Sequence, residues 1–181
     1  PANPSIEKYV VASNNGIETH KFTCCVIGYI LHGEKYVYYD DKCYKFSQGD
    51  LFFLGMGCHY TKNIPEEGHP YEQILVRFTP EELQRILLHL NITYKLNITN
   101  NHLCEKCRTL NHAAMPAFDP ALFNHTNDYL TEDSFLHDPP AENIKITELI
   151  YLIVSHGDCC IKSKLLGNVD AARDNLQQTV Y

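Results

Sequence analysis

The chain has 181 residues, of which 44% are hydrophobic and 20% are charged, so it can bury a substantial core. Its formal net charge of −7 offers no basic face for nucleic-acid phosphates, and we expect that this chain by itself does not bind DNA. No run of about 18 apolar residues occurs, and residues 1–4 lack the basic and apolar segments of a signal peptide, so no membrane helix or secretion signal is expected.

The first 78 residues contain short strand patterns separated by turn formers, which is typical of a β-sandwich or barrel. Residues 23–31 form a nearly continuous apolar run rich in Val, Ile and Tyr. At the turn 47–50, Gly49 can adopt a positive φ and Asp50 can bond back to its own turn, so the chain can reverse without strain. Further strands are expected at 35–39, 43–46, 51–54 and 71–78.

The periodicity changes after Phe78, where a helix is expected to begin. Thr79 can act as the N-cap, Pro80 fits the first turn, and Glu82 completes a capping box. The spacing of Leu83, Ile86, Leu87 and Leu90 places these side chains in one apolar stripe. Residues 91–101 are expected to form an extended connector.

Three more helices are expected towards the end of the chain, at about 119–130, at 146–154 and after Asn168. The stripe of 146–154 is wide, so this helix must be buried against the strands, the last helix or a second subunit. Strands in one block followed by helices in another predict an α+β fold, with an antiparallel β-barrel in residues 1–78 and helices in 79–181.

Three segments in this order, 28–34, 44–54 and 57–59, resemble the N-terminal cupin-like domains of AraC/XylS-family transcription regulators. Residues 74–78 match the closing strand of these domains, and residues 145–152 match the helix before their linker. The resemblance implies a cupin-like jelly roll in residues 1–78 and a helical dimerisation and linker region in residues 79–181.

The resemblance also implies a function. It implies a cytoplasmic bacterial regulator that senses a small-molecule or protein effector through this domain. It implies a homodimer formed through helices 144–156 and 169–181. DNA binding would belong to a C-terminal domain that this chain does not include.

Enzymatic cupins hold a metal with a His-x-His pair, a Glu and a later His. In this chain only His20 and His59 lie near such positions, and Phe22 stands where the second early His would be needed. Two histidines leave a divalent ion under-coordinated. We therefore expect no metal, no cofactor and no enzymatic activity, and the alternative is a cupin-type metal enzyme with an unusual ligand set.

Tyrosines are frequent in the expected strands. A tyrosine offers a flat apolar face and one hydroxyl group, which suits a small ligand, although tyrosine is also favoured in strands for packing alone. The candidate ligand-binding residues are Tyr29, Tyr36, Tyr38, His59 and Tyr60.

The chain contains eight cysteines. It is too long and too rich in ordinary core residues to need a disulfide framework, so buried reduced thiols are expected. One local cluster leaves three alternatives open: a tetrahedral Zn²⁺ site, a redox pair, or structural thiols. This cluster consists of His102, Cys104, Cys107 and His112.

Overall fold

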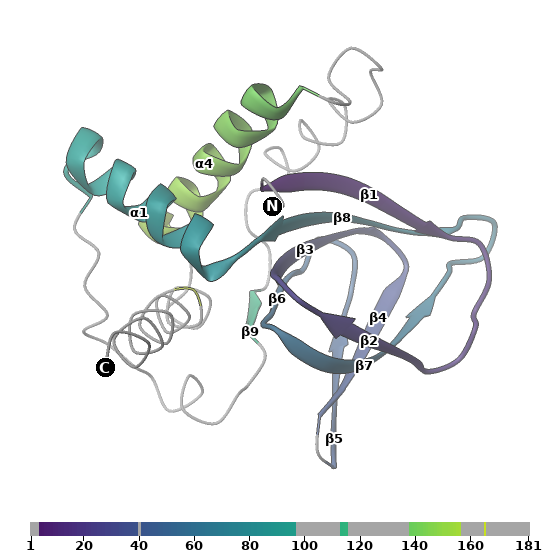
Figure 1. Cartoon of the computed structure of the whole chain (residues 1–181). Helices are drawn as coiled ribbons and strands as arrows, with labels where there is room; N and C mark the ends of the chain where they lie inside the picture. The colour runs from purple at the N-terminus through teal and green to yellow at the C-terminus, as the bar shows by residue number, and fades with distance from the viewer. Residues whose placement is uncertain (1–3, 40, 97–112, 116–137, 157–164, 166–181) are drawn as a thin grey trace.

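Two antiparallel β-sheets lie face to face, and helices cover the outer side of one of them (Figure 1). In this computed structural model the described residues are 4–39, 41–96, 113–115, 138–156 and 165. The prediction of antiparallel strands followed by helices is confirmed. Within the described residues no strand pairing joins the two sheets, so the fold is a two-sheet sandwich. The closed barrel predicted for residues 1–78 is therefore wrong, because the described strands at the sheet edges do not pair with each other.

The first sheet, here called sheet A, has five strands within the described residues, and the second, sheet B, has four. In spatial order sheet A contains β1 (Ser5–Val11), β8 (Tyr71–Phe78), β3 (Cys25–His32), β6 (Leu51–Leu54) and β9 (Ala113–Met115). Sheet B contains β2 (Glu18–Phe22), β7 (Gly57–Ile64), β4 (Glu34–Tyr39) and β5 (Lys42–Phe46). Because most neighbouring strands are distant in sequence, the chain crosses repeatedly between the sheets, as in a jelly roll.

The central strand β3 is buried on both faces, which explains why its sequence is a continuous apolar run. Val26 and Ile30 face sheet B, whereas Ile27 and Tyr29 face the helices. The Phe52 side chain of the neighbouring strand also points between the sheets. The inter-sheet core consists of Val26, Ile30, Val37, Phe46, Phe52, Leu54, Tyr71 and Leu75.

Helix α1 (Pro80–Tyr94) begins with the predicted capping box, which is confirmed. The Glu82 backbone N–H donates to Thr79 Oγ1 at 3.1 Å, and the Thr79 N–H donates to Glu82 Oε2 at 2.8 Å. The helix continues past residue 91 and ends at Lys95, which adopts a left-handed conformation with φ of 56°. The connector predicted from residue 91 therefore begins later, because residues 91–94 contain no proline or glycine to break the helix.

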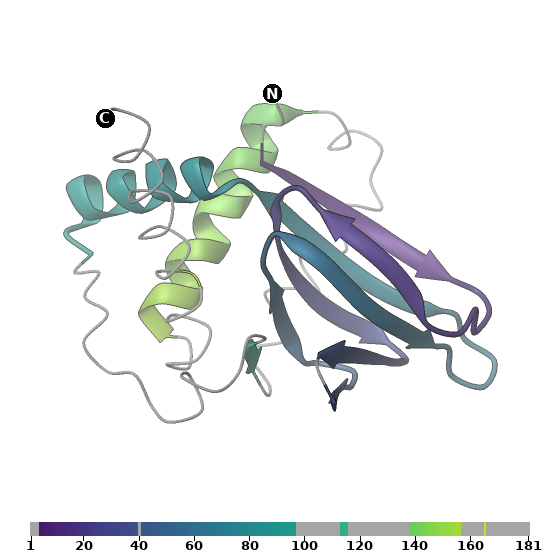
Figure 2. The same ribbon diagram turned by 60° about the horizontal axis from the view of Figure 1, so that its bottom comes forward.

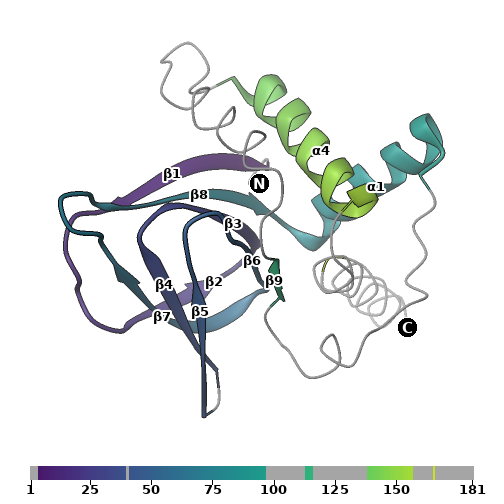
Figure 3. The same ribbon diagram turned by 180° about the vertical axis from the view of Figure 1, so that it is seen from behind.

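Helix α4 (Pro139–His156) crosses beside α1 (Figures 2 and 3). It includes the predicted helix 146–154 and begins about two turns earlier. Its apolar stripe packs within this chain, against the outer face of sheet A and against α1. The stripe consists of Ile146, Leu149, Ile150, Ile153 and Val154, all buried. The prediction that this helix packs on the strands is therefore confirmed, and the last helix, a second predicted partner, lies outside the described residues.

The remaining predictions concern residues 79–181 and the absence of a membrane helix. The helices predicted at 119–130 and after Asn168 lie outside them. Strand β9 lies within the range 79–181 that was expected to be helical, and it pairs with β6 at the edge of sheet A. Among the described helices, none combines the length and the apolar character needed to cross a membrane.

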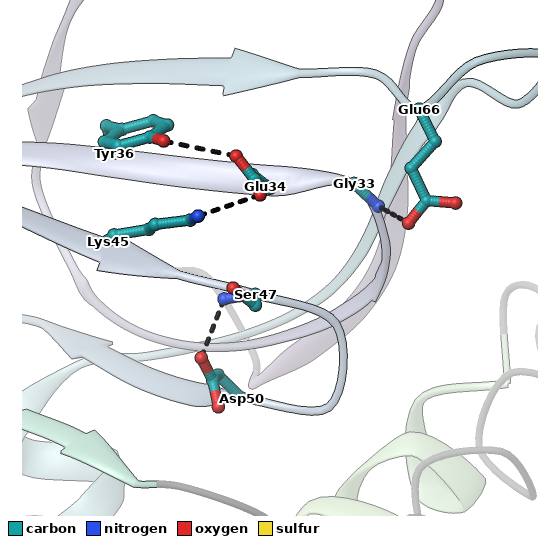
Figure 4. Close-up of polar contacts among 7 residues, drawn as sticks. All are labelled: Gly33, Glu34, Tyr36, Lys45, Ser47, Asp50 and Glu66. Atoms are coloured by element: carbon teal, nitrogen blue, oxygen red, sulfur yellow. Dashed lines mark hydrogen bonds and ion pairs between the residues drawn. The ribbon is translucent and has the colours of Figure 1, made fainter.

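The predicted turn at 47–50 is confirmed. Gly49 has φ of 87°, and Asp50 Oδ2 accepts a hydrogen bond of 2.7 Å from the Ser47 backbone N–H (Figure 4). This turn links β5 of sheet B to β6 of sheet A.

Candidate functional site

A cluster of polar side chains lies on the inner face of sheet B. Lys35 of β4 and Asn63 of β7 are opposite one another in the sheet, and Lys35 Nζ donates to Asn63 Oδ1 at 2.9 Å. Thr61 occupies the next inward position on β7, and its buried Oγ1 has no hydrogen-bond partner among the described residues. The exposed fractions are 4% for Lys35, 8% for Asn63 and 1% for Thr61, so all three are shielded from solvent.

Lys35 is a cation enclosed between the sheets. Its Nζ lies 5.3 Å from the centre of the Phe52 ring and 5.8 Å from the centre of the Tyr71 ring, both on sheet A. Burial lowers the pKa of Lys35 to about 8, an effect that the charge of Glu18 partly opposes. Among the described residues no carboxylate lies within ion-pair distance of Lys35. A buried charge with one neutral hydrogen-bond partner is costly, and strongly perturbed groups of this kind gather at functional sites.

The opposite wall of the interior is also partly polar. Tyr71 and Gln73 occupy inward positions on β8, and the Tyr71 hydroxyl donates to Gln73 Oε1. Burial raises the pKa of Tyr71, so this hydroxyl stays protonated. Together the two sheets place an ammonium group, two amides and two hydroxyls around an otherwise apolar interior. We call the set Lys35, Thr61, Asn63, Tyr71 and Gln73 the interior polar cluster.

His59 lies on the same inner face of sheet B, 8% exposed. Its Nε2 contacts the Gly55 carbonyl oxygen at 2.6 Å, and its ring lies 5.4 Å from that of Phe22. His20 is its cross-strand neighbour and has Nε2 3.4 Å from Glu18 Oε2. Burial, followed by the charge of Lys35, lowers the pKa of His20. Among the described residues, neither histidine belongs to a group of three or more converging metal-ligand atoms.

The predicted tyrosines lie elsewhere. Tyr29 is buried in the cluster that faces the helices. Tyr36 alternates with the inward residues of β4, and Tyr38 pairs with Tyr60 across the sheet, so these three lie on the outer face of sheet B. The Tyr36 hydroxyl donates to Glu34 Oε2 at 3.2 Å (Figure 4). The five residues predicted to bind ligand therefore do not share one site, and their role stays a prediction.

A pocket of about 740 Å³ lies between α1, α4 and the start of β1. Its volume is within the range of about 300–1,000 Å³ that is typical of small-molecule sites. Charged groups reach it from Glu82, Arg85 and Glu148. The rest of the lining includes Pro4, Ile86, Leu90, Tyr94, Ile144 and Tyr151.

The described cysteines are joined by no disulfide, but they are not all buried. Cys24 is partly buried, whereas Cys25 is buried, and burial raises the pKa of Cys25 to about 12. Cys43 and Cys58 are exposed on β5 and β7. The prediction of buried thiols is therefore correct for Cys25 and wrong for these two, because their strand positions face away from the core. The cluster at residues 102–112 lies outside the described residues.

The residues that sequence reasoning missed are Lys35, Thr61 and Asn63. A signal was present, since β4 alternates and Lys35 shares a face with Val37, which is fully buried. For β7 the signal was weaker, because its inward residues His59, Thr61 and Asn63 are all polar. Period-two patterns of this kind are visible only once the strand is recognised.

Comparisons with known proteins give one family. The model of the AraC-like ligand binding domain matches residues 11–121, more than half of the chain. The crystal structure of apo ToxT from Vibrio cholerae is similar in fold, with a TM-score of 0.60 at 7% identity. That similarity covers 87% of this chain and 58% of ToxT, so the chain spans little more than half of the ToxT length.

Two other solved structures show weaker similarity. A cupin superfamily protein from Desulfitobacterium hafniense has a TM-score of 0.37 at 11% identity, over 44% of this chain and 70% of that one. A deletion mutant of oxalate decarboxylase from Bacillus subtilis has a TM-score of 0.35 at 20% identity, over 41% of this chain and 21% of that one. Among curated proteins, none matches the sequence.

Proposed function

The chain belongs to the AraC-like ligand-binding domain family, and from this premise we propose that it senses an effector in the interior between its two sheets. The observation that carries this proposal is Lys35, a buried cation without a carboxylate partner among the described residues. The effector would be a small molecule with an anionic or strongly accepting group at one end and an apolar body.

The energetics of the interior polar cluster favour such a ligand. An anionic group beside Lys35 Nζ would supply the missing counter-charge, and charge-assisted hydrogen bonds are stronger than neutral ones. Thr61 Oγ1 would gain the partner that it lacks among the described residues. The aromatic rings of Phe46, Phe52 and Tyr71 would contact the apolar body of the ligand. His59, one of the predicted ligand-binding residues, lies one inward position beyond Thr61.

A second candidate location is the pocket between α1 and α4. Arg85 would provide the positive charge there, and the volume of about 740 Å³ is sufficient for a small molecule. The two locations predict different effects of mutation, because Lys35 does not line this pocket.

A thermal-shift screen of small carboxylates and phosphate esters tests the proposal. Compounds that bind at the interior polar cluster should stabilise the wild-type chain and lose this effect in Lys35→Met. The matched control is Lys21→Met, because Lys21 is an exposed lysine on β2. Compounds whose effect survives Lys35→Met and disappears in Arg85→Met would instead assign sensing to the pocket between the helices.

We further propose that the chain acts as part of a longer cytoplasmic transcription regulator and has no enzymatic activity. Residues 1–78 would sense the effector, and residues 79–181 would transmit its presence to a DNA-binding domain elsewhere in the protein. The net charge of −7 supports a division of labour in which another domain contacts DNA. Electrophoretic mobility measurements should show no DNA binding by this chain at physiological salt.

Homodimerisation through helices 144–156 and 169–181 is a separate proposal. The apolar stripe of α4 is used within the chain, so the dimer would need the remaining exposed apolar residues. Leu88 and Ile92 on α1 are 59% and 62% exposed, and Ile144 on α4 is 69% exposed. Light scattering at rising concentration should detect a dimer that Ile144→Glu weakens and that Ile17→Glu, at an exposed position before β2, leaves intact. A wild-type monomer at all concentrations would contradict this proposal.

A further inference from the structure

A group of two histidines and one carboxylate lies at the end of sheet A that is distant from α1. His32 ends β3, Glu72 lies near the start of β8, and the two are opposite one another in the strand pairing. His69 lies in the connection between β7 and β8. One potential ligand atom from each residue lies within 4.8 Å of the other two.

The backbone holds these residues together. The pairing of β3 with β8 is shifted between Ile30 and His32, and an irregularity of this kind redirects a side chain. The Gly33 backbone N–H donates to Glu66 Oε1 at 2.9 Å, which ties the β7–β8 connection to the end of β3 (Figure 4). Gly33 has φ of 91°, and an added Cβ would lie 2.6 Å from the Ile64 carbonyl oxygen, so this close approach requires glycine.

His69 is oriented as metal-bound histidines commonly are. His69 Nδ1 lies 3.0 Å from the Pro70 carbonyl oxygen, which can only accept, so Nδ1 carries the proton. This contact leaves Nε2 as the nitrogen that can bind an ion, and a backbone carbonyl that orients the ring in this way is the usual support of a metal-bound histidine. The rings of His32 and His69 are stacked with centres 3.9 Å apart, so the two imidazoles lie side by side.

We propose that His32, His69 and Glu72 form a binding site for a divalent transition-metal ion of the Zn²⁺ class. Two imidazole nitrogens and one carboxylate oxygen are a ligand set that Zn²⁺ accepts, with its fourth position left to water or another ligand. Ligand atoms around one tetrahedral Zn²⁺ lie about 3.3 Å apart, so the three side chains need to rotate slightly inwards. All three are partly exposed, which leaves a path for the ion.

One neighbour competes with the ion. Lys8 Nζ lies 3.6 Å from Glu72 Oε2, and this ion pair is partly exposed. Its loss would cost little, because exposed pairs contribute about 0–1 kcal/mol. The site is separate from the interior polar cluster, since Glu72 alternates along β8 with the inward residues Tyr71 and Gln73. A bound ion would hold in place the turn at Gly33, which immediately precedes β4 and lies two residues before Lys35.

Zn²⁺ binding should be measured by equilibrium dialysis with elemental analysis, on the chain carrying Cys104→Ser and Cys107→Ser. These two changes remove the thiolates of the other candidate cluster. We expect one Zn²⁺ per chain, and affinity that falls about tenfold or more in each of His32→Ala and His69→Ala. With Co²⁺ as the probe, the visible spectrum should lack the intense charge-transfer band of a thiolate ligand.

The matched control is His20→Gln, which changes a histidine that pairs with His59 across β2 and β7, away from the proposed site. Circular dichroism of each metal-free variant verifies its fold. Lys8→Met keeps all three ligands and removes the competing ammonium group, so it should raise the affinity. Zn²⁺ affinity that is absent in the parent chain, unchanged in both alanine variants, or lost equally in His20→Gln would overturn the proposal. Weaker binding in Lys8→Met would exclude Glu72 as a ligand.

Discussion

Replacing Lys35 by methionine removes the buried charge and keeps an unbranched side chain of similar length. In the folded chain burial lowers the pKa of Lys35 from 10.5 to about 8. At about 1.4 kcal/mol for each unit of pKa difference, this corresponds to roughly 3 kcal/mol of lost stability while the folded state is forced to hold the charge.

The sign of the pH dependence follows from this difference. Between pH 8 and pH 10.5 the unfolded chain retains a proton on Lys35 that the folded chain has released. The unfolded state therefore binds more protons, and stability rises with pH across this window. The penalty is fully present below about pH 8 and disappears above about pH 10.5. Lys35→Met has neither the penalty nor this contribution to the pH dependence.

Methionine also leaves Asn63 Oδ1 without its donor, which costs about 1–3 kcal/mol for a buried acceptor. At pH 7 this loss is offset by removal of the cost of burying a charged Lys35, so Lys35→Met should be about as stable as the wild type or slightly more stable. At pH 10 Lys35 is mostly neutral in the folded wild type, so the substitution removes little charge-burial cost, and the variant should be less stable than the wild type by about 1–2 kcal/mol.

The assay is equilibrium unfolding in urea at pH 7 and pH 10, for the wild type, Lys35→Met and Lys21→Met. The difference in unfolding free energy between the wild type and Lys35→Met should change by about 2.5 kcal/mol between the two pH values. Groups that do not interact with Lys35 cancel in this difference. Parallel pH dependences of the two proteins would refute the reasoning, because they would mean that Lys35 titrates alike in the folded and unfolded chain.

Three other predictions concern the fold. Thr79→Ala should lower the unfolding free energy by about 1 kcal/mol through loss of the capping box, whereas Thr79→Ser should retain most of it, as urea unfolding of both variants can check. Gly28→Ala should destabilise by about 1–3 kcal/mol, because its Cβ would overlap the Phe52 ring, and Phe52→Leu in the same chain should recover part of this loss. Iodoacetamide should modify Cys43 and Cys58 in the native chain within minutes but Cys25 only after unfolding, and mass spectrometry of the digested protein would expose an error in this order.

Much of the sandwich could be predicted from local chemistry. The β3 strand was visible because both of its faces are buried, which makes its sequence apolar throughout. The start of α1 was visible because capping is a local interaction between Thr79 and Glu82. Strands β1, β2 and β7 were missed, since they are half-buried and place polar residues on both faces. Strand β9 has only three residues and forms by pairing with β6, so the sequence of 113–115 alone carries no recognisable strand pattern.

The candidate site was harder to predict because it depends on which strands are neighbours. Lys35 and Asn63 are 28 positions apart, and their contact exists through the pairing of β4 with β7. The tyrosines were chosen for their chemistry, but alternation along β4 turns Tyr36 and Tyr38 to the outer face and Lys35 to the interior. Tyrosine is a suitable residue type for binding a ligand, but the alternation of side chains along β4 determines which of them can face a ligand between the sheets.

The same kind of alternation separates the two proposed sites on one short stretch of chain. Along β8 the side chains of Tyr71 and Gln73 face the interior that contains Lys35. The side chain of Glu72, between them, lies on the opposite face, near His32 and His69. An effector beside Lys35 and an ion held by Glu72 would therefore act on the two faces of a single strand. Since strand β8 continues directly into α1, both sites lie on an element that leads into the helical region. If both are occupied in solution, Zn²⁺ and effector should alter each other's affinity by the same factor, as linkage requires.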